Sequence, residues 1–83
     1  MQKTDVIWFD GEFVPWDRAQ VHVLTHTLHY GLGVFEGIRC YATSDGRSAV
    51  FRLRDHTRRL FASARILNLA IPFDEQAIDA ACL

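Results

Sequence analysis

The stretch of sequence that decides the fold is HTLHYGLGVFEGIRCY, which runs from His26 to Tyr41. It places three glycines, Gly31, Gly33 and Gly37, in a segment that is otherwise mostly apolar and aromatic. Glycine is used where the backbone adopts unusual dihedral angles or where another group approaches closely. Because a phenylalanine, a glutamate and an arginine share the same run, the segment is more typical of a pocket wall than of a plain strand.

Turn-forming residues on the N-terminal side of this stretch predict a β-hairpin. The dipeptide Asp10-Gly11 separates two β-prone runs, Val6–Phe9 and Glu12–Trp16. Asp-Gly is favoured in tight hairpin turns because both central residues need a positive φ. Pro15 should either end the second strand or restrict it to a sheet edge, since proline cannot donate a ladder hydrogen bond.

The stretch itself is expected to hold the end of a helix and the start of a second hairpin. Residues 24–30 can form about two turns of helix, which Gly31 would end. Residues 33–41 are expected to be a strand. A polar loop at 42–48 would then lead into a return strand at Ala49–Leu53.

The remaining sequence predicts two helices. From Asp55 to about Asn68 the hydrophobic period becomes helical, and the chain then breaks at Pro72. The apolar stripe of this helix consists of Leu60, Phe61, Ala64 and Leu67. Asp74 is a suitable N-cap for a final helix. Two hairpins and two helices predict an α+β fold, in which the hairpins form an antiparallel sheet and the helices pack on it.

Composition excludes several classes of protein. Hydrophobic residues make up 49% and charged residues 23% of the chain, which is ordinary for a soluble globular protein and argues against disorder. The net charge of −1 gives no general attraction to nucleic acid or to a membrane surface. Two cysteines are too few for a disulfide scaffold, and Cys40 is expected to be reduced and packed. With no apolar run of about 20 residues and no signal peptide, the expected compartment is the cytoplasm.

The length and the C-terminal end suggest an incomplete protein. Eighty-three residues allow one domain or part of one. A helix begins after Phe73, and the chain stops at Leu83 without the glycine, basic residue or proline that usually marks a helix end. We therefore expect residues 1–83 to be the N-terminal portion of a longer protein whose C-terminal domain is absent.

Most of the positive charge lies in the predicted first long helix and just before it. Six of the eight arginines fall between Arg47 and Arg65, but the low net charge and the lack of a known motif disfavour nucleic-acid binding. Arg58 and Arg65 are interpreted as part of an exposed helix face. Arg59 precedes Leu60 of the apolar stripe, so it needs an anionic partner, and its planar group suits a phosphate. Periodicity alone does not choose Arg59 over Arg58.

The histidines do not predict a metal site. His22, His26 and His29 are close in sequence, but no acidic or thiolate ligand occurs at matching spacing, and H-E-x-x-H is absent. Hydrogen-bonded structural histidines are the favoured interpretation.

The pattern H-x-L-H-Y-G-x-x-x-F-E-G-I-R-x-Y resembles the N-terminal signature of the branched-chain amino acid aminotransferases, which are class IV aminotransferases that use pyridoxal 5'-phosphate (PLP). The resemblance covers residues 7–83, or about the first quarter of a typical member. It implies that the chain is the small N-terminal α+β domain of that fold. It also implies a homodimer or higher homo-oligomer that transfers the amino group of leucine, isoleucine or valine to 2-oxoglutarate.

The same resemblance supplies a cofactor-binding residue but no catalytic one. The segment D-H-x-x-R-L-x-x-S-A is similar to the family's helix whose arginine binds the PLP phosphate, and that arginine aligns with Arg59. A PLP aminotransferase also needs a lysine that holds the cofactor as a Schiff base and moves protons. The only lysine here is Lys3, in a polar tail, and the family's lysine lies beyond Leu83. The 83 residues alone are expected to be inactive.

Four further residues match substrate-binding positions of the family. Tyr30 and Phe35 would be aromatic walls of the pocket for the branched side chain, and Tyr30 would act across a dimer interface. Gly37 would let the substrate approach the backbone. Arg39 would lie behind the pocket, where Glu36 could pair with it. From the residues alone, the four would be a core tyrosine and phenylalanine, a strand glycine and an edge arginine.

Two kinds of alternative remain at this point. D-amino acid aminotransferases and aminodeoxychorismate lyases share the fold and the phosphate-binding arginine, although the F-E-G-I-R run favours the branched-chain enzymes. A non-catalytic interaction domain is the alternative of another class, in which the aromatic residues would form a protein interface.

Overall fold

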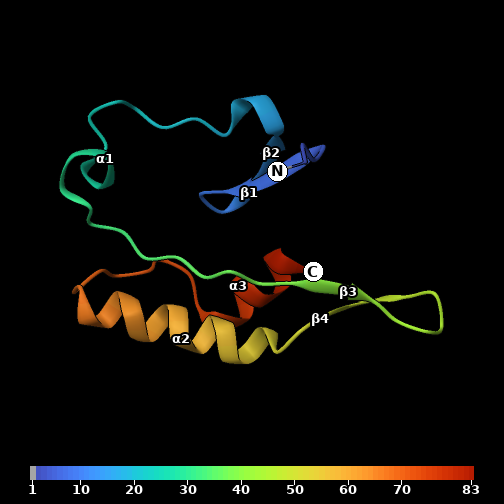
Figure 1. Ribbon diagram of the computed structural model, residues 1–83. Coiled ribbons are helices and arrows are strands. Elements are labelled where there is room, and N and C mark those ends of the chain that lie inside the picture. The colour runs from blue at the N-terminus through green and yellow to red at the C-terminus, as the bar shows by residue number, and fades with distance from the viewer. Residues whose placement is uncertain (1) are drawn as a thin grey trace. The chain divides into compact units, whose positions relative to one another are not determined.

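The computed structural model describes residues 2–83, which form two compact units. The first unit extends to Leu32, and the second runs from Gly33 to Leu83 (Figure 1). Each unit contains one β-hairpin and at least one helix, so each is described by itself.

The first unit begins with the predicted hairpin. Strand β1 (Val6–Phe9) pairs antiparallel with β2 (Glu12–Pro15), and Phe9 faces Glu12 across the turn. Asp10 and Gly11 have φ values of 51° and 95°, so both turn residues have the positive φ that the sequence predicts. The second strand ends at Pro15, as expected.

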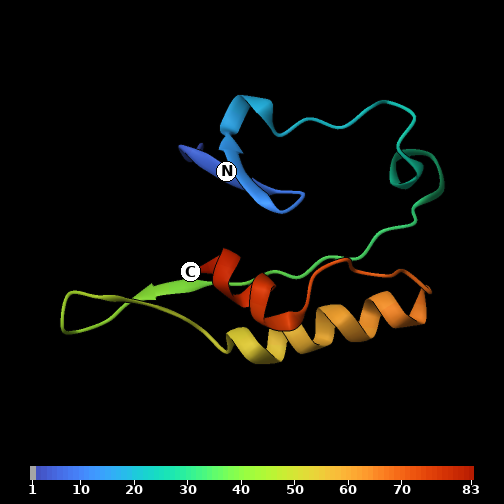
Figure 2. The same ribbon diagram turned by 180° about the vertical axis from the view of Figure 1, so that it is seen from behind.

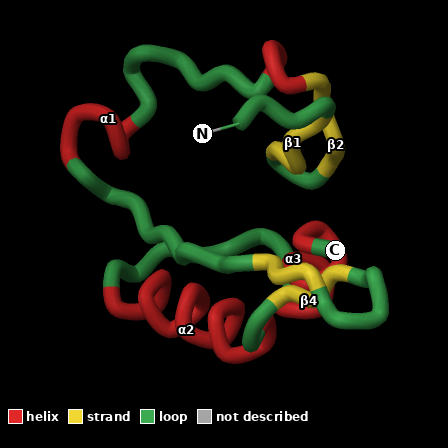
Figure 3. Tube along the Cα trace, turned by 45° about the vertical axis from the view of Figure 1, so that its right-hand side comes forward, coloured by secondary structure: helices red, strands yellow, loops and turns green. Residues whose placement is uncertain are grey.

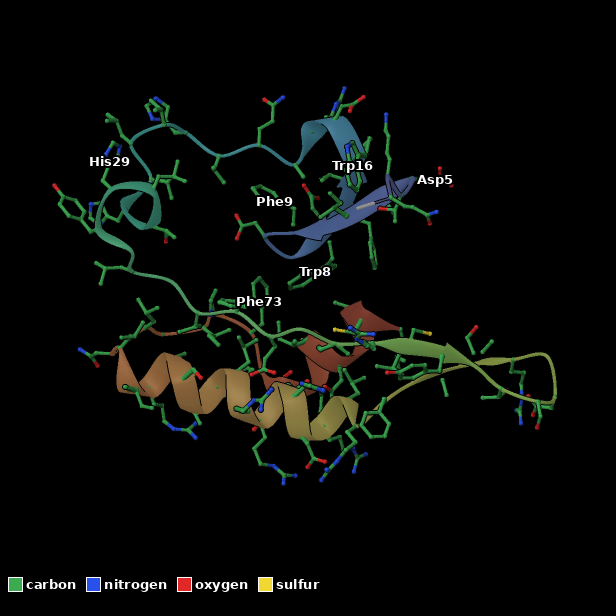
Figure 4. The ribbon with its side chains drawn as sticks, viewed as in Figure 1. Asp5, Trp8, Phe9, Trp16, His29 and Phe73 are labelled. Carbon is green, nitrogen blue, oxygen red and sulfur yellow. The ribbon has the colours of Figure 1, made fainter. Side chains whose placement is uncertain are left out.

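A small group of half-buried aromatic side chains lies on this hairpin and just after it. Trp8 and Phe9 belong to β1, and Trp16 opens a short 3-10 helix, η1 (Trp16–Arg18) (Figure 4). The Trp16 backbone N–H donates to the Asp5 carbonyl oxygen at 3.2 Å, which ties η1 to the start of β1.

The helix of the first unit is shorter than predicted, but it ends where predicted. Helix α1 (His26–Tyr30) has Gly31 at its C-cap, in the left-handed region with φ 67°. The Gly31 N–H donates to the Thr27 carbonyl oxygen at 3.1 Å, and the Thr27 hydroxyl donates to the Leu32 carbonyl oxygen at 2.6 Å. The first bond uses a carbonyl group of the last helical turn, and the second ties the chain just after the helix back to it.

The second hairpin is shorter than the sequence predicts. Strand β3 (Cys40–Ala42) pairs antiparallel with β4 (Ser48–Val50), whereas residues 33–39 run as a loop (Figure 3). The prediction of a strand over residues 33–39 is therefore wrong. The reason lies in the return strand: the Phe51 N–H donates to the Arg39 carbonyl oxygen at 2.9 Å, and the chain then turns into a helix. Residues before Arg39 have no strand opposite them to complete a ladder.

Two helices form the core of the second unit. Helix α2 (Leu53–Ile66) packs against α3 (Glu75–Cys82) (Figure 2). Thr57 and Ala64, which lie two turns apart on α2, are buried. The Thr57 hydroxyl donates to the Asp79 carboxylate at 2.5 Å, which links the two helices.

The predicted N-cap of α3 is present, and the predicted apolar stripe of α2 is only partly buried. The Asp74 side chain accepts a hydrogen bond from the Ala77 N–H at 2.8 Å, so the predicted N-cap is confirmed. In the apolar stripe, Leu60 and Phe61 are half-buried and Ala64 is buried, but Leu67 is 41% exposed. Leu67 lies outside the buried face because α2 ends at Ile66.

The α+β class is confirmed. Within residues 2–83, the two hairpins form separate two-stranded sheets rather than one shared sheet. In this part of the chain, none of the helices has both the length and the apolar character needed to cross a bilayer.

Candidate functional site

The second unit contains a cluster of charged side chains centred on Arg59. Helix α2 carries Arg59 on the side that meets Glu36, which lies in the loop before β3. The Arg59 Nε donates to Glu36 Oε2 at 2.7 Å, and Nη2 donates to Oε1 at 2.6 Å. The Glu36 side chain is only 8% exposed, whereas the Arg59 side chain is 66% exposed. One bidentate ion pair therefore joins a covered carboxylate to an open guanidinium.

His56 binds the same carboxylate from one turn earlier on α2. Its Nδ1 lies 2.8 Å from Glu36 Oε1, and the side chain is 19% exposed. Because an ionised carboxylate only accepts hydrogen bonds, Nδ1 must carry the proton and donate it. His56 and Arg59 are three residues apart and so project from one helix face.

These hydrogen bonds control the pKa of the carboxyl group. The Arg59 hydrogen bonds, followed by the hydrogen bond from His56, lower the pKa of Glu36 from 4.5 to about 2. The same contact with Glu36 raises the pKa of Arg59. The ion pair therefore stays fully charged at neutral pH.

We expect this shift to be visible as a titration of Glu36 with a midpoint of about 2 instead of 4.5. Because the folded-state pKa is lowered, the pair stabilises the fold fully above 4.5 and loses its effect as the pH falls through about 2. The measurement is the carboxyl ¹³C shift of Glu36 in labelled protein. In an R59M variant the midpoint should rise toward 4.5. A wild-type midpoint close to 4.5 would contradict the expectation.

Arg59 borders an open cleft of about 420 Å³ in the second unit. The cleft is lined by Phe51, Arg52, Asp55, His56 and Arg59. The Arg52 Nε donates to Asp55 at 2.7 Å, so that pair is internally neutralised. With Arg52 paired to Asp55, Arg59 is the exposed cationic group that the cleft offers to a small anion, beside one histidine and one aromatic side chain.

Three of the sequence-predicted substrate residues lie in the second unit, close together in the chain. Phe35 is 88% exposed, and a methyl group built on Gly37 would meet no atom within 4 Å. Arg39 lines a smaller cleft of about 240 Å³, formed with Ile38, Cys40, Val50 and Cys82. Phe35 and Gly37 therefore offer open surface, and Arg39 belongs to a different cleft from Arg59.

Tyr30 belongs to the first unit, at the end of α1. Its side chain is 73% exposed, and its ring stacks edge-on with His26 at a centroid distance of 5.7 Å. The neighbouring histidines bond locally: His29 Nε2 lies 2.6 Å from the Val23 carbonyl oxygen, and His22 Nδ1 accepts from the Leu24 N–H at 3.0 Å. These two histidines are hydrogen-bonded, as the sequence predicts.

Two details of the sequence interpretation need correction. Glu36 pairs with Arg59 and His56 rather than with Arg39, because α2 brings its side chains to the loop that carries Glu36. Cys40 is free but exposed, so it is not the packed thiol that the apolar sequence around it suggests. Arg58 and Arg65 are exposed, as expected.

Sequence reasoning missed the carboxylate and the histidine of this cluster as site residues. The available signal was the spacing of His56 and Arg59, which places a histidine and an arginine on one helix face. In the described part of the chain, no group of three or more histidine, cysteine or acidic residues is arranged to hold a metal ion.

Comparison with known proteins identifies what this arrangement resembles. No family model matches the chain. It is 59% identical over 76 residues to the branched-chain-amino-acid aminotransferase of Pseudomonas aeruginosa, covering 92% of this chain and 24% of that protein. It is 51% identical over 78 residues to the enzyme of the same name from Escherichia coli K12, covering 94% of this chain and 24% of that protein.

Solved structures agree with the sequence comparison. The Escherichia coli branched-chain amino acid aminotransferase superposes with a TM-score of 0.91 at 49% identity, covering 96% of this chain and 26% of that one. The T.th. enzyme, complexed with N-(5'-phosphopyridoxyl)-L-glutamate, gives a TM-score of 0.89 at 46% identity, covering 96% and 27%. The chain thus spans about a quarter of the length of the relatives it matches. We conclude that it belongs to the branched-chain-amino-acid aminotransferase family.

Proposed function

We propose that this chain is a segment of a PLP-dependent transaminase that moves the amino group of leucine, isoleucine or valine to 2-oxoglutarate. The products would be branched-chain 2-oxo acids and glutamate. The support is the identity to branched-chain-amino-acid aminotransferases over 92% of the chain. Below, the full-length protein means the polypeptide that contains this segment.

Arg59 is the residue proposed to hold the cofactor, through its phosphate. Its Nε and Nη2 already donate to Glu36, but its side chain remains 66% exposed at the edge of the cleft. A guanidinium has five N–H donors, so donors remain for a phosphate. This fixed, exposed cation in an open cleft is the observation that supports Arg59 as the phosphate-binding residue. PLP, when bound, supplies an electron sink for chemistry at the amino acid's α-carbon.

The other matched residues are proposed to contact the substrate. Phe35 would pack against the branched aliphatic side chain, and Tyr30 would contact the substrate bound by the partner subunit; the large exposed aromatic surface of each supports these roles. Gly37 would allow the substrate close to the backbone, and the open space beside it is compatible with that role. Arg39 would support this region from its own small cleft.

We further propose that the full-length protein works as a homodimer or higher homo-oligomer in the cytoplasm. The exposure of Tyr30, at 73%, fits a side chain that a partner subunit would cover. The two free cysteines fit a reducing compartment.

The proposal is tested by comparing the segment with the full-length protein. Full-length protein supplied with PLP, leucine and 2-oxoglutarate should form 4-methyl-2-oxopentanoate and glutamate. The 83-residue chain should form neither, because Lys3 is its only lysine and is exposed in the N-terminal tail. Chromatographic detection of the oxo acid is the measurement.

The same assay separates the related activities. Transamination of D-alanine, or release of pyruvate from aminodeoxychorismate, in place of the leucine reaction would contradict the proposal. Product formation by the 83-residue chain would contradict the assignment of the catalytic lysine to another part of the protein.

A further inference from the structure

The Arg59 guanidinium is held along only one of its edges. Glu36 accepts from Nε and Nη2, which form the side edge of the planar group. The end edge consists of Nη1 and the second hydrogen of Nη2; Nη2 also lies 3.5 Å from His56 Nδ1, a long contact to an atom that already binds Glu36 at 2.8 Å. Among residues 2–83, no hydrogen bond joins Nη1 to another group, and the Arg59 side chain is 66% exposed. The edge away from the carboxylate is thus available for a second bidentate partner.

The Glu36 carboxylate, which holds the side edge of the Arg59 guanidinium, is itself fixed. Both Glu36 oxygens are used: Oε2 accepts from Arg59 Nε, and Oε1 accepts from Arg59 Nη2 and from His56 Nδ1. Two side chains from successive turns of α2 therefore converge on one carboxylate that is 8% exposed. Because the group is covered, it anchors the arginine without being open to a ligand itself.

We propose that Glu36 is a positioning residue that orients the Arg59 guanidinium so that its end edge faces the cofactor phosphate, with His56 holding the carboxylate in place. This inference rests on the proposed function. A long flexible arginine loses conformational freedom when it binds an anion, and a partner that has already fixed it removes part of that cost. Because both Glu36 oxygens are held by donors from α2, the anchor keeps its charge and its place when the cleft is empty.

The negative charge of Glu36 has an opposing effect. It reduces the net attraction between the arginine and a phosphate dianion, so orientation and charge act in opposite directions. The carboxylate sits on the side edge and is covered, which keeps it out of contact with an anion at the end edge. We infer that orientation outweighs the lost attraction, and the sign of the effect is measurable.

The test is the E36Q variant of the full-length protein. A glutamine keeps the size of the side chain but removes the charge and one acceptor oxygen. Dissociation constants are measured on apoprotein for PLP and for pyridoxal, which lacks the phosphate. We expect E36Q to weaken PLP binding about 3- to 10-fold, while pyridoxal changes by less than about twofold. E12Q, at an exposed position on β2, is the matched control and should leave both constants unchanged.

Each outcome decides the inference. An unchanged preference for PLP over pyridoxal in E36Q, an equal loss for both ligands, or tighter PLP binding would overturn it. If E36Q does not fold, E36D is used instead. It keeps the charge but shortens the side chain by one methylene, and the ratio of PLP to pyridoxal affinity is compared with wild type in the same way.

An R59M variant, which removes the charge and all donors of the guanidinium, separates failure of this inference from failure of the proposed function. If R59M leaves the preference for PLP over pyridoxal unchanged, Arg59 does not bind the phosphate, and the inference is wrong as well. If R59M lowers this preference but E36Q does not, only the role of Glu36 is wrong.

Discussion

Replacing Arg59 by lysine in the full-length protein should weaken PLP binding about 10- to 100-fold, while pyridoxal binding stays nearly the same. Lysine keeps the positive charge but is a point donor, so it cannot bind a phosphate along one edge and a carboxylate along another. The structure shows Arg59 using Nε and Nη2 together on Glu36, at 2.7 and 2.6 Å. A lysine ammonium can donate to both Glu36 and the phosphate, but only from one nitrogen, so both bidentate contacts are lost. The measurement is a binding titration of apoprotein, followed by cofactor absorbance.

Arg58 provides the matched control for this experiment. It is the adjacent residue on α2, and it borders a different cleft, together with Arg54, Glu75, Gln76 and Asp79. An R58K variant should therefore retain wild-type affinity for PLP. No loss in either R58K or R59K would mean that positive charge on α2, and not the edge geometry of Arg59, holds the phosphate, whereas an equal loss in both would mean that the effect is not specific to Arg59.

The arginine also shows where sequence reasoning reached its limit. Hydrophobic periodicity could not choose between Arg58 and Arg59, because both lie beside the apolar stripe, and only the resemblance to the family selected Arg59. In the structure the difference is the partner: Glu36 is 23 residues away along the chain. Such a pairing depends on how α2 packs against the loop, which no local pattern contains.

Features set by neighbouring residues were predictable. The positive φ values of Asp10 and Gly11, the left-handed Gly31 that ends α1, and the Asp74 N-cap all depend on a few consecutive residues. Thr57 was missed for the opposite reason. A polar residue breaks an apolar stripe in sequence, yet Thr57 is buried because Asp79 of another helix accepts its hydroxyl hydrogen bond.

The strand predicted over residues 33–39 failed for a related reason. Strand formation needs a partner strand, and the chain after Phe51 turns into α2 instead of continuing the hairpin. The lack of strand pairing also decides which side chains this segment exposes. A segment without ladder partners leaves Phe35 exposed and Gly37 with open space, while Glu36 points to α2. The irregular loop thus presents an aromatic side chain and bare backbone on an open face.

The second large effect expected is that of replacing Phe35 by alanine in the full-length protein. If Phe35 packs against the branched side chain of the substrate, kcat/KM for leucine should fall about 10- to 100-fold, which corresponds to the loss of one buried aromatic contact. The much smaller side chain of L-alanine does not reach such a wall, so its kcat/KM should hardly change. The ratio of the two values, from steady-state kinetics, is the readout.

A matched control isolates this contact from general effects of losing an exposed aromatic. Phe13 on β2 is 60% exposed, compared with 88% for Phe35, and F13A should leave the ratio of leucine to alanine unchanged. An equal fall of kcat/KM for both substrates in F35A would mean that Phe35 maintains the structure of the site and does not contact the substrate side chain. No fall for either substrate would show that Phe35 does not contribute to binding the substrate. Only a selective fall for leucine supports Phe35 as the wall that recognises a branched chain, because specificity is a difference between two substrates and not an affinity for one.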